Sequence, residues 1–367
     1  MNRLVGWLLF ARLLASAALP AWAQRPRIAV ETDRGVDLVN ALMVQLSPEL
    51  LPDSTAAPHQ WGTTRLMRVS YAHFAPFRGH AAVRRTHWLA DKIGTGVYLL
   101  PLFYDGFPRP RRHTPVSRPL LEAIHPNADS AARIVEDYMQ LVGRFYREAA
   151  FARFHRRHRR VYAQARAEVR RNLPPPNFLP TMEAYYGAHQ AAYRLVVNPF
   201  FKADWGMAWQ VDGALGPTAV QIAAPFGEQT LARGRVVRAG FDNADAVRNL
   251  SVHEFGHTFV NPLTARPALA AGIAAHRPLF RPISGQAQYR DWETSFNEHL
   301  VRAGEVRLAV ALGRADVAQQ LRTAYADWMY LPFFEAQLQR YEADRRRYPT
   351  LEAFLPNLIA ALPTLAR

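Results

Sequence analysis

The chain of 367 residues contains no cysteine. Without a thiol it can form no disulfide framework, no thiolate metal site and no lipid-modified cysteine. An exported protein of this composition would not depend on an oxidising compartment to fold. Any metal ion held by side chains must therefore be bound by histidine, aspartate or glutamate.

Lysine is almost absent, because Lys92 and Lys202 are the only two in the chain. The other basic residues are arginines, and the formal net charge is +15. A basic exported protein could associate electrostatically with anionic envelope components such as polymers or lipid head groups. A surface of solvated arginines has the same composition, so composition alone leaves both interpretations open.

Long apolar runs are missing after the first 23 residues, so no later stretch predicts a membrane span. At the start, Arg3 precedes the mostly apolar run Leu4–Leu19, and Ala21-Trp22-Ala23 matches a cleavage site. We predict a secretory signal peptide at residues 1–23, cut after Ala23, and therefore a periplasmic or secreted protein. A membrane anchor is the alternative, but Arg12 leaves the run short of the ~20 residues that a spanning helix needs.

The longest helical pattern runs from Asn127 to Arg171 and contains a basic cluster at His155–Arg160. Aromatic residues interleave with the cluster, a pattern that also occurs in nucleic-acid-binding surfaces. Because export argues against a nucleic-acid partner, we interpret the cluster as a charged helix face.

The proline-rich stretch Leu173–Pro176 predicts a boundary between a mostly helical region, 24–176, and a catalytic region, 177–367. The two could also form one integrated domain.

Short apolar runs predict strands at Arg27–Val30, Tyr193–Asn198, Met207–Gln210 and Ala219–Ala223. Helical periodicity at Gly35–Leu46 and through most of the C-terminal third predicts helices between and after them. The expected fold class is therefore α+β, with a small mixed sheet over one central helix and a largely helical N-terminal portion.

That central helix carries His253-Glu254-Phe255-Gly256-His257, an H-E-x-x-H pattern. Two histidines four residues apart lie on one face of a helix, about 6 Å apart along its axis, and can bind one metal ion. The intervening glutamate is close enough to act on a water bound to that ion. This is the arrangement of zinc-dependent peptidases, with Glu254 as the catalytic residue.

The sequence around the motif predicts a buried helix from Ala244 to Val260. Asp242 and Asn243 can cap its start, and Pro262 disfavours the helical conformation in the residue before it. An isolated H-E-x-x-H match also occurs by chance, and a histidine on an apolar helix is often only a hydrogen-bonded core residue. The capped and almost charge-free helix favours the metal site.

A catalytic zinc usually has a third protein ligand and an open position. The metzincin class needs a histidine six residues after the second motif histidine, where this chain has Leu263. His276 follows a glycine- and alanine-rich segment that reads as a loop. The helix predicted from Asp291 to about Ala311 offers further candidates, and its periodicity slightly favours Glu293. The alternatives that remain on this helix are Glu298 and His299.

The motif together with Asn297-Glu298, 41 residues after His257, resembles the gluzincin class of zinc metallopeptidases. The strings His253–Pro262 and Asn297–Ala303 also resemble a bacterial exported family known only as a domain of unknown function. The gluzincin resemblance implies zinc as the cofactor and Glu298 as its third ligand, beside His253 and His257.

The expected function is that of an exported zinc metallopeptidase, which hydrolyses peptide bonds with a zinc-activated water and Glu254 as general base. We expect Asp291 or Asn297 to orient a ligand histidine, and Tyr289 or Tyr330 to stabilise the oxyanion. The expected partner is a peptide or protein substrate, and no nucleic acid.

The alternative is a non-catalytic, zinc-stabilised binding protein of the cell envelope with a closed site. A scaffold in which the motif is accidental is a further alternative.

Overall fold

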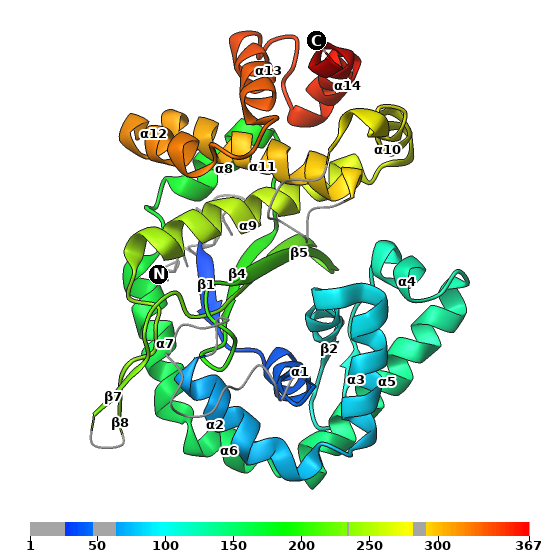
Figure 1. The fold of residues 1–367 in the computed structure, drawn as a ribbon, viewed down its shortest axis with the longest axis vertical. Helices are drawn as coiled ribbons and strands as arrows, with labels where there is room; N and C mark the ends of the chain where they lie inside the picture. Colours follow the sequence, from blue (N-terminus) through cyan, green and yellow to red (C-terminus); the bar gives the residue numbers. More distant parts are fainter. Residues whose placement is uncertain (1–25, 47–63, 233–234, 282–290, 367) are drawn as a thin grey trace, which may run out of the picture.

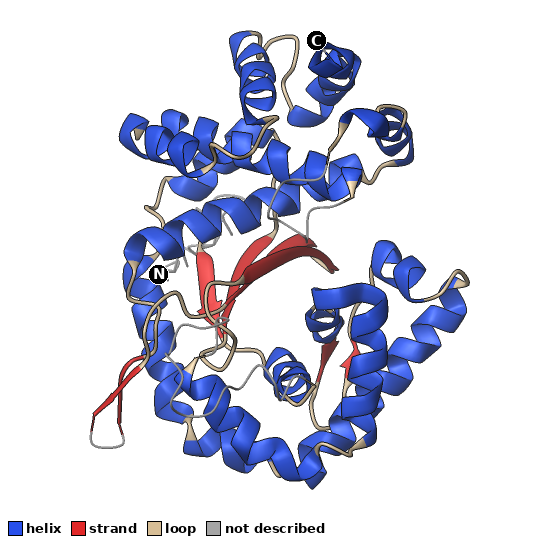
Figure 2. Ribbon diagram, viewed as in Figure 1, coloured by secondary structure: helices blue, strands red, loops and turns tan. Residues whose placement is uncertain are grey.

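The computed structural model of the protein describes residues 26–46, 64–232, 235–281 and 291–366. The predicted signal peptide and Tyr289 lie outside these residues. Within them, no helix is both long enough and apolar enough to cross a bilayer. The fold is α+β, and it has a small mixed sheet and a largely helical N-terminal portion, as the sequence predicts (Figures 1 and 2).

The main sheet has the strand order β1-β4-β6-β5. Its strands are β1 (Ile28–Glu31), β4 (Ala192–Val197), β5 (Gly206–Gly213) and β6 (Gly216–Ala223). The first two and β6 are parallel, and β5 pairs antiparallel with β6 as the strand at one edge. Each of the four overlaps a predicted strand segment, although Arg27 and Asn198 lie just outside β1 and β4. Two-stranded ribbons are formed by β2 (Tyr104–Asp105) with β3 (Arg111–Arg112), and by β7 (Thr230–Ala232) with β8 (Arg235–Arg238).

Two long helices lie on one side of the sheet (Figure 1). Helix α9 (Ala244–Thr264) packs on β5 and β6. Helix α11 (Trp292–Ala311) packs on the face of α9 that points away from the sheet. Asn243 caps α9 through a bond from the Ala246 amide, and Asp291 caps α11 in the same way. The sheet, the motif helix and the helix carrying Glu298 therefore form successive layers.

The sequence predicts that this helix ends at Val260, before Pro262. In the structure α9 continues through Pro262 to Thr264. A proline inside a helix removes the hydrogen bond to the carbonyl four residues earlier, which here belongs to Thr258. The side chain of Gln190 donates to this carbonyl at 3.3 Å. A distant amide thus satisfies the acceptor, and the helix can pass through the proline.

The N-terminal helices surround a core that α1, α3 and α5 share. The predicted tract Asn127–Arg171 is three helices, because Ala150 has a left-handed backbone and His158 interrupts the next turn. The proline- and arginine-rich segment from Leu99 to Pro119 contains the β2–β3 ribbon. The helices of this part are α1 (Arg34–Val44), α2 (Arg65–Phe74), α3 (Ala81–Ile93), α4 (Arg118–Ile124), α5 (Ala128–Glu148), α6 (Phe151–Arg157) and α7 (Arg159–Asn172), with 3-10 helices η4 (Ala75–Phe77), η5 (Gly94–Tyr98) and η6 (Leu100–Phe103).

The C-terminal helices form a second core with α8 and the outer face of α11. Gly313 has a positive φ and separates the end of α11 from α12. The segment before His276 is helical and not a loop. These elements are α8 (Phe178–Tyr186), α10 (Pro267–Ala274), α12 (Ala315–Ala324), α13 (Leu331–Ala343) and α14 (Leu351–Ala361), with 3-10 helices η7 (Arg277–Leu279) and η9 (Leu362–Ala366).

The proposed boundary near residue 176 stays a prediction, but the sheet crosses it. Strand β1 comes from the first region and pairs with β4 from the second. The N-terminal core likewise includes Val196, Val220 and Ile222 from the sheet. The two regions therefore share buried surface.

Candidate metal centre

The two motif histidines lie side by side on α9, facing α11. Their Nε2 atoms are 3.1 Å apart, and their ring planes are nearly perpendicular. Both side chains are mostly buried, with 13% and 12% of their surface exposed. The four-residue spacing places them on one face, as the sequence predicts.

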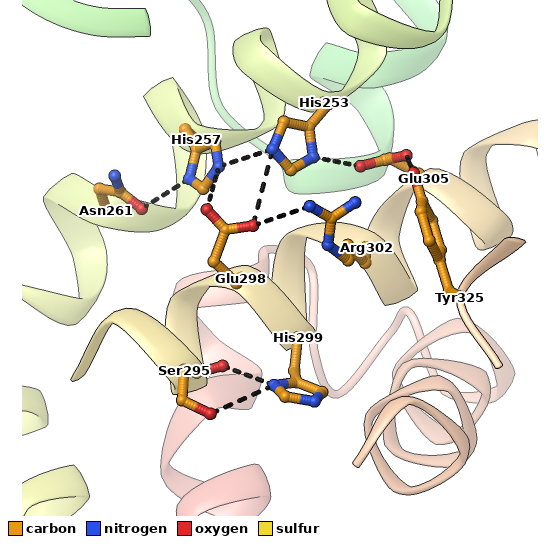
Figure 3. Close-up of polar contacts among 9 residues, drawn as sticks. All are labelled: His253, His257, Asn261, Ser295, Glu298, His299, Arg302, Glu305 and Tyr325. Atoms are coloured by element: carbon orange, nitrogen blue, oxygen red, sulfur yellow. Dashed lines mark hydrogen bonds and ion pairs between the residues drawn. The ribbon is translucent and has the colours of Figure 1, made fainter. Parts of the chain in front are cut away.

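Glu298 completes the group from α11, where its carboxylate points at both imidazoles (Figure 3). Its oxygens lie 3.3 Å from the Nε2 of His257 and 3.7 Å from that of His253. Two atoms that bind one tetrahedral zinc ion at about 2.0–2.1 Å lie about 3.3–3.4 Å from each other. The three side chains thus form a group of the right size to hold a metal ion.

The other ring nitrogens show that this group suits a cation. The Nδ1 of His253 contacts the carboxylate of Glu305, and the Nδ1 of His257 lies 3.2 Å from Oδ1 of Asn261. Because both partners are acceptors, each ring in its neutral form carries its proton on Nδ1 and presents a lone pair at Nε2. In that form two lone pairs and the carboxylate of Glu298 converge on one buried point. A positive charge there, either a proton on His257 or a metal ion, offsets their repulsion.

These orienting residues differ from the ones that we expected. Asp291 caps α11, and Asn297 is half-buried without a hydrogen bond to Oδ1 among the described residues. Neither bonds to a ligand histidine. Asn261 follows His257 by four residues, so helical spacing could have identified it. Glu305 lies two turns after Glu298, and only the orientation of α11 reveals its role.

Arg302 connects the ligand carboxylate to the orienting one. Its guanidinium lies 3.3 Å from Glu298 and stacks over the rings of Tyr325 and Trp328 at 4.6 and 4.0 Å. The hydroxyl of Tyr325 donates to Glu305 at 2.5 Å. The two carboxylates are thus fixed in place by one arginine and one tyrosine (Figure 3).

The charges of the group are strongly coupled. Burial lowers the pKa of His257, but the hydrogen bond and charge of Glu298 outweigh burial and raise it to about 9. Burial raises the pKa of Glu298, but His257, His253 and Arg302 outweigh burial and lower it to about 2. Glu298 is therefore ionised at neutral pH, and a metal ion that takes His257 as a ligand displaces a proton from it.

Glu254 is 5% exposed and lies on the side of α9 that faces the sheet. Burial raises its pKa, which the two motif histidines lower and which Glu298 and Glu305 raise further. A Cβ on Gly206 of β5 would lie 3.1 Å from the carboxylate oxygen of Glu254. The carboxyl group is therefore next to the edge strand and close to the histidines.

The other candidate ligands lie elsewhere. Glu293 is exposed, and His276 is not part of the group. The ring of His299 points away from α9, with its Nδ1 2.7 Å from the carbonyl of Ser295 (Figure 3). Periodicity favoured Glu293 because it assumes one buried face. Helix α11 is buried on two faces, against α9 and against α13, so its apolar residues do not mark the side that carries the candidate ligand.

The sequence suggested Tyr330 as a residue that could stabilise the oxyanion, but its hydroxyl already makes two hydrogen bonds to the main chain. It donates to the carbonyl of Leu279 at 2.7 Å and accepts from the amide of Arg281 at 2.8 Å. This tyrosine therefore ties the segment after η7 to α13. Its ring also packs against His299 at 5.0 Å.

A further residue positions the two ligand helices. The buried hydroxyl of Tyr186, at the end of α8, lies between α9 and α11. A Cβ would be 3.5 Å from it at Gly256 and only 2.6 Å from it at Gly304. The ring stacks on Phe259, and burial raises the pKa of the phenol above its usual range. Glycine at 304 thus makes room for a group that sets the spacing of the helices.

Comparison with protein families gives one match. The model of the family described as Domain of unknown function (DUF4932) matches residues 123–361, so the chain belongs to this family. The match spans α5 to α14 and includes both ligand helices. It confirms the resemblance to a domain of unknown function, and its description names no activity. Searches of curated proteins and of solved structures each gave no match.

Proposed function

We propose that this member of the DUF4932 family is an exported zinc-dependent metallopeptidase of the gluzincin type. His253, His257 and Glu298 would hold the zinc, and Glu254 would act as general base. The predicted signal peptide supports a periplasmic or secreted location, and a peptide or protein would be the substrate.

The observation that carries this proposal is the convergence of three buried donors at separations of 3.1, 3.3 and 3.7 Å. Catalytic zinc sites typically use three protein ligands and keep one position open, whereas structural sites use four. Among the described residues, no fourth histidine, aspartate or glutamate joins the group. The ligand number therefore favours an enzyme over a zinc-stabilised binding protein.

Zinc in this position would supply Lewis acidity, which polarises a carbonyl and lowers the pKa of a bound water. The residues of the chain supply the proton transfers. Glu254 would take a proton from the attacking water and pass it to the leaving amine. Its buried position, which raises the pKa of its carboxyl group, makes it a better base than an exposed glutamate.

The edge strand β5 supports a peptide as substrate. Among the described strands it pairs only with β6, so its other edge has no strand partner there. The hydroxyl of Thr114 donates to the carbonyl of Asp212 near the end of β5, so the part of the edge open to an extended chain would be the part nearer Gly206. Gly206 lets this strand lie close to α9, where a Cβ would meet the methyl groups of Leu250 and the carboxylate of Glu254. A peptide that adds to the sheet along β5 would pass the proposed base, with main-chain hydrogen bonds holding it there.

The test is the metal content of purified protein after zinc reconstitution, for wild type, His253→Ala and Glu298→Gln. The matched control is Glu293→Gln, which makes the same change on an exposed position of the same helix. We expect about one zinc per chain in wild type and in the control, none in His253→Ala and a weakened site in Glu298→Gln.

Two results would overturn the proposal. Absence of zinc in the reconstituted wild type would remove the enzyme and leave the scaffold alternative. Equal zinc affinity in Glu298→Gln and Glu293→Gln would show that Glu298 is not a ligand. If zinc binds as expected but a peptidase screen finds no hydrolysis, the zinc-stabilised binding protein is the better function.

A further inference from the structure

The stretch from the end of α5 to the end of α7 has an unusual charge. Residues 144–171 contain ten arginines and two glutamates. Neither glutamate pairs with an arginine. Glu148 contacts His80 at 3.2 Å, and Glu168 is buried and accepts from the amides of Ala239 and Phe241. Within the described part of the chain, this stretch therefore has no salt bridge between an arginine and a carboxylate.

Five of these arginines form a compact group, which we call the basic face. All five are exposed. Three lie on α6, where Arg153 is three and four residues before the other two, and two follow at the start of α7. The helices that carry them run along the outer edge of the molecule (Figure 1). The members of the basic face are Arg153, Arg156, Arg157, Arg159 and Arg160.

The aromatic residues of the same helices point the other way. Phe151, Phe154 and Tyr162 are each at most 2% exposed and belong to the N-terminal core. Proteins that bind single-stranded nucleic acid stack bases on exposed aromatic rings, which the basic face does not offer. What remains on the surface is a set of guanidinium groups, which match phosphate groups in geometry and charge.

We propose that the basic face docks the protein on the surface of a bilayer that contains anionic phospholipids. Clusters of four to eight basic residues on a helix have the size that binds acidic head groups. Without protruding aromatic side chains, the contact would be electrostatic, and the protein would lie on the head groups without entering the acyl chains. The basic face contains no residue of the metal centre, so this inference is independent of the proposed function.

The test is co-sedimentation of the purified protein with vesicles of phosphatidylcholine alone or mixed with phosphatidylglycerol. One variant combines Arg153→Gln, Arg157→Gln and Arg160→Gln. The matched variant combines Arg340→Gln, Arg346→Gln and Arg347→Gln, which are exposed arginines of the C-terminal region. Both variants lose three charges and keep the same N-terminal segment, so lipid binding by that segment cancels in their comparison.

We expect wild type to bind the phosphatidylglycerol vesicles more tightly than the neutral ones, and less tightly as salt rises. Each arginine near an anionic membrane adds roughly fivefold in affinity, so the basic-face variant should bind about a hundredfold more weakly. The matched variant should stay within about threefold of wild type. Unchanged melting temperatures of both variants would show that they are folded.

Three results would overturn the proposal. The first is equal binding of wild type to both kinds of vesicle. The second is an equal loss of affinity in the two variants, which would make net charge the cause. Tighter binding of an oligothymidine strand than of anionic vesicles, lost in the basic-face variant, would identify nucleic acid as the partner.

Discussion

The C-terminal helices and the α5–α7 stretch use arginine in opposite ways. On α11 to α13, Arg302, Arg307 and Arg322 are paired with Glu298, Glu342 and Glu335. On α5 to α7, no arginine is paired with a carboxylate within the described residues. The first arrangement fixes buried carboxylates in place, and the second leaves cations on the surface. Arginine thus pairs with carboxylates in one region and stays exposed in the other, where we propose that it binds a membrane surface.

Glu254 on α9, next to the paired region, makes no salt bridge among the described residues. Glu254→Gln should reduce peptide hydrolysis about 10²–10⁴-fold, because the amide cannot accept the proton. Zinc content should stay the same, since Glu254 is not a ligand. The measurement is the hydrolysis rate of an unfolded-protein substrate, with zinc per chain determined on the same sample.

Glu293→Gln is the control for this experiment, and it should keep the wild-type rate. A rate that is unchanged in Glu254→Gln would contradict the role of Glu254 as base, even if zinc is bound. A rate lost together with the zinc would show that Glu254 helps to form the site.

Arg307→Met tests the paired network itself. The substitution leaves Glu342 and Glu335 with one fewer cation, and the free energy of unfolding should fall by about 3 kcal/mol. The matched change Arg160→Met on α7 removes an exposed arginine that pairs with no carboxylate, and should alter stability by about 0.5 kcal/mol or less. Urea unfolding of both variants measures the difference, and equal effects would contradict the comparison.

Asp37 in the N-terminal core is a buried carboxyl group that, unlike Glu298 and Glu335, has no salt bridge among the described residues. Burial raises the pKa of Asp37 well above its usual range, and Tyr162 offsets only part of this. The folded state therefore holds the proton more tightly than the unfolded state, so the contribution of Asp37 to stability is greatest below about pH 4 and falls as pH rises. Asp37→Asn should remove this loss and raise stability at neutral pH by about 2 kcal/mol.

Thermal unfolding of Asp37→Asn and wild type between acidic and neutral pH tests this prediction. The two proteins should differ least at the acidic end. Asp137→Asn, at an exposed position of α5, is the control and should behave as wild type does. A variant less stable than wild type at neutral pH would show that the ionised carboxylate is satisfied.

The sequence predicted the features that depend on local spacing. The four strands of the main sheet, the cap of α9 and the shared face of His253 and His257 follow from periodicity and helix geometry. The four strands of the two ribbons were not predicted. The choice of Glu298 came from resemblance, since periodicity favoured Glu293. The continuation of α9 past Pro262, which depends on Gln190, could not be predicted from nearby residues.

The remaining parts of the site depend on tertiary packing. Glu305 can orient His253 only because α11 packs on α9 with one particular rotation. Arg302 stacks on Tyr325 and Trp328, which come from beyond the end of α11. Such contacts join residues far apart in the chain, and no pattern within one helix indicates them.

The hydroxyl of Tyr186 between Gly256 and Gly304 has a consequence for the order of assembly. The histidine pair exists as soon as α9 forms, but Glu298 reaches it only when α8, α9 and α11 have docked together. A chain with every ligand intact but with α8 displaced would hold metal poorly. Metal loading would then report completed tertiary docking, a checkpoint on folding in a protein that has no disulfide to serve that purpose.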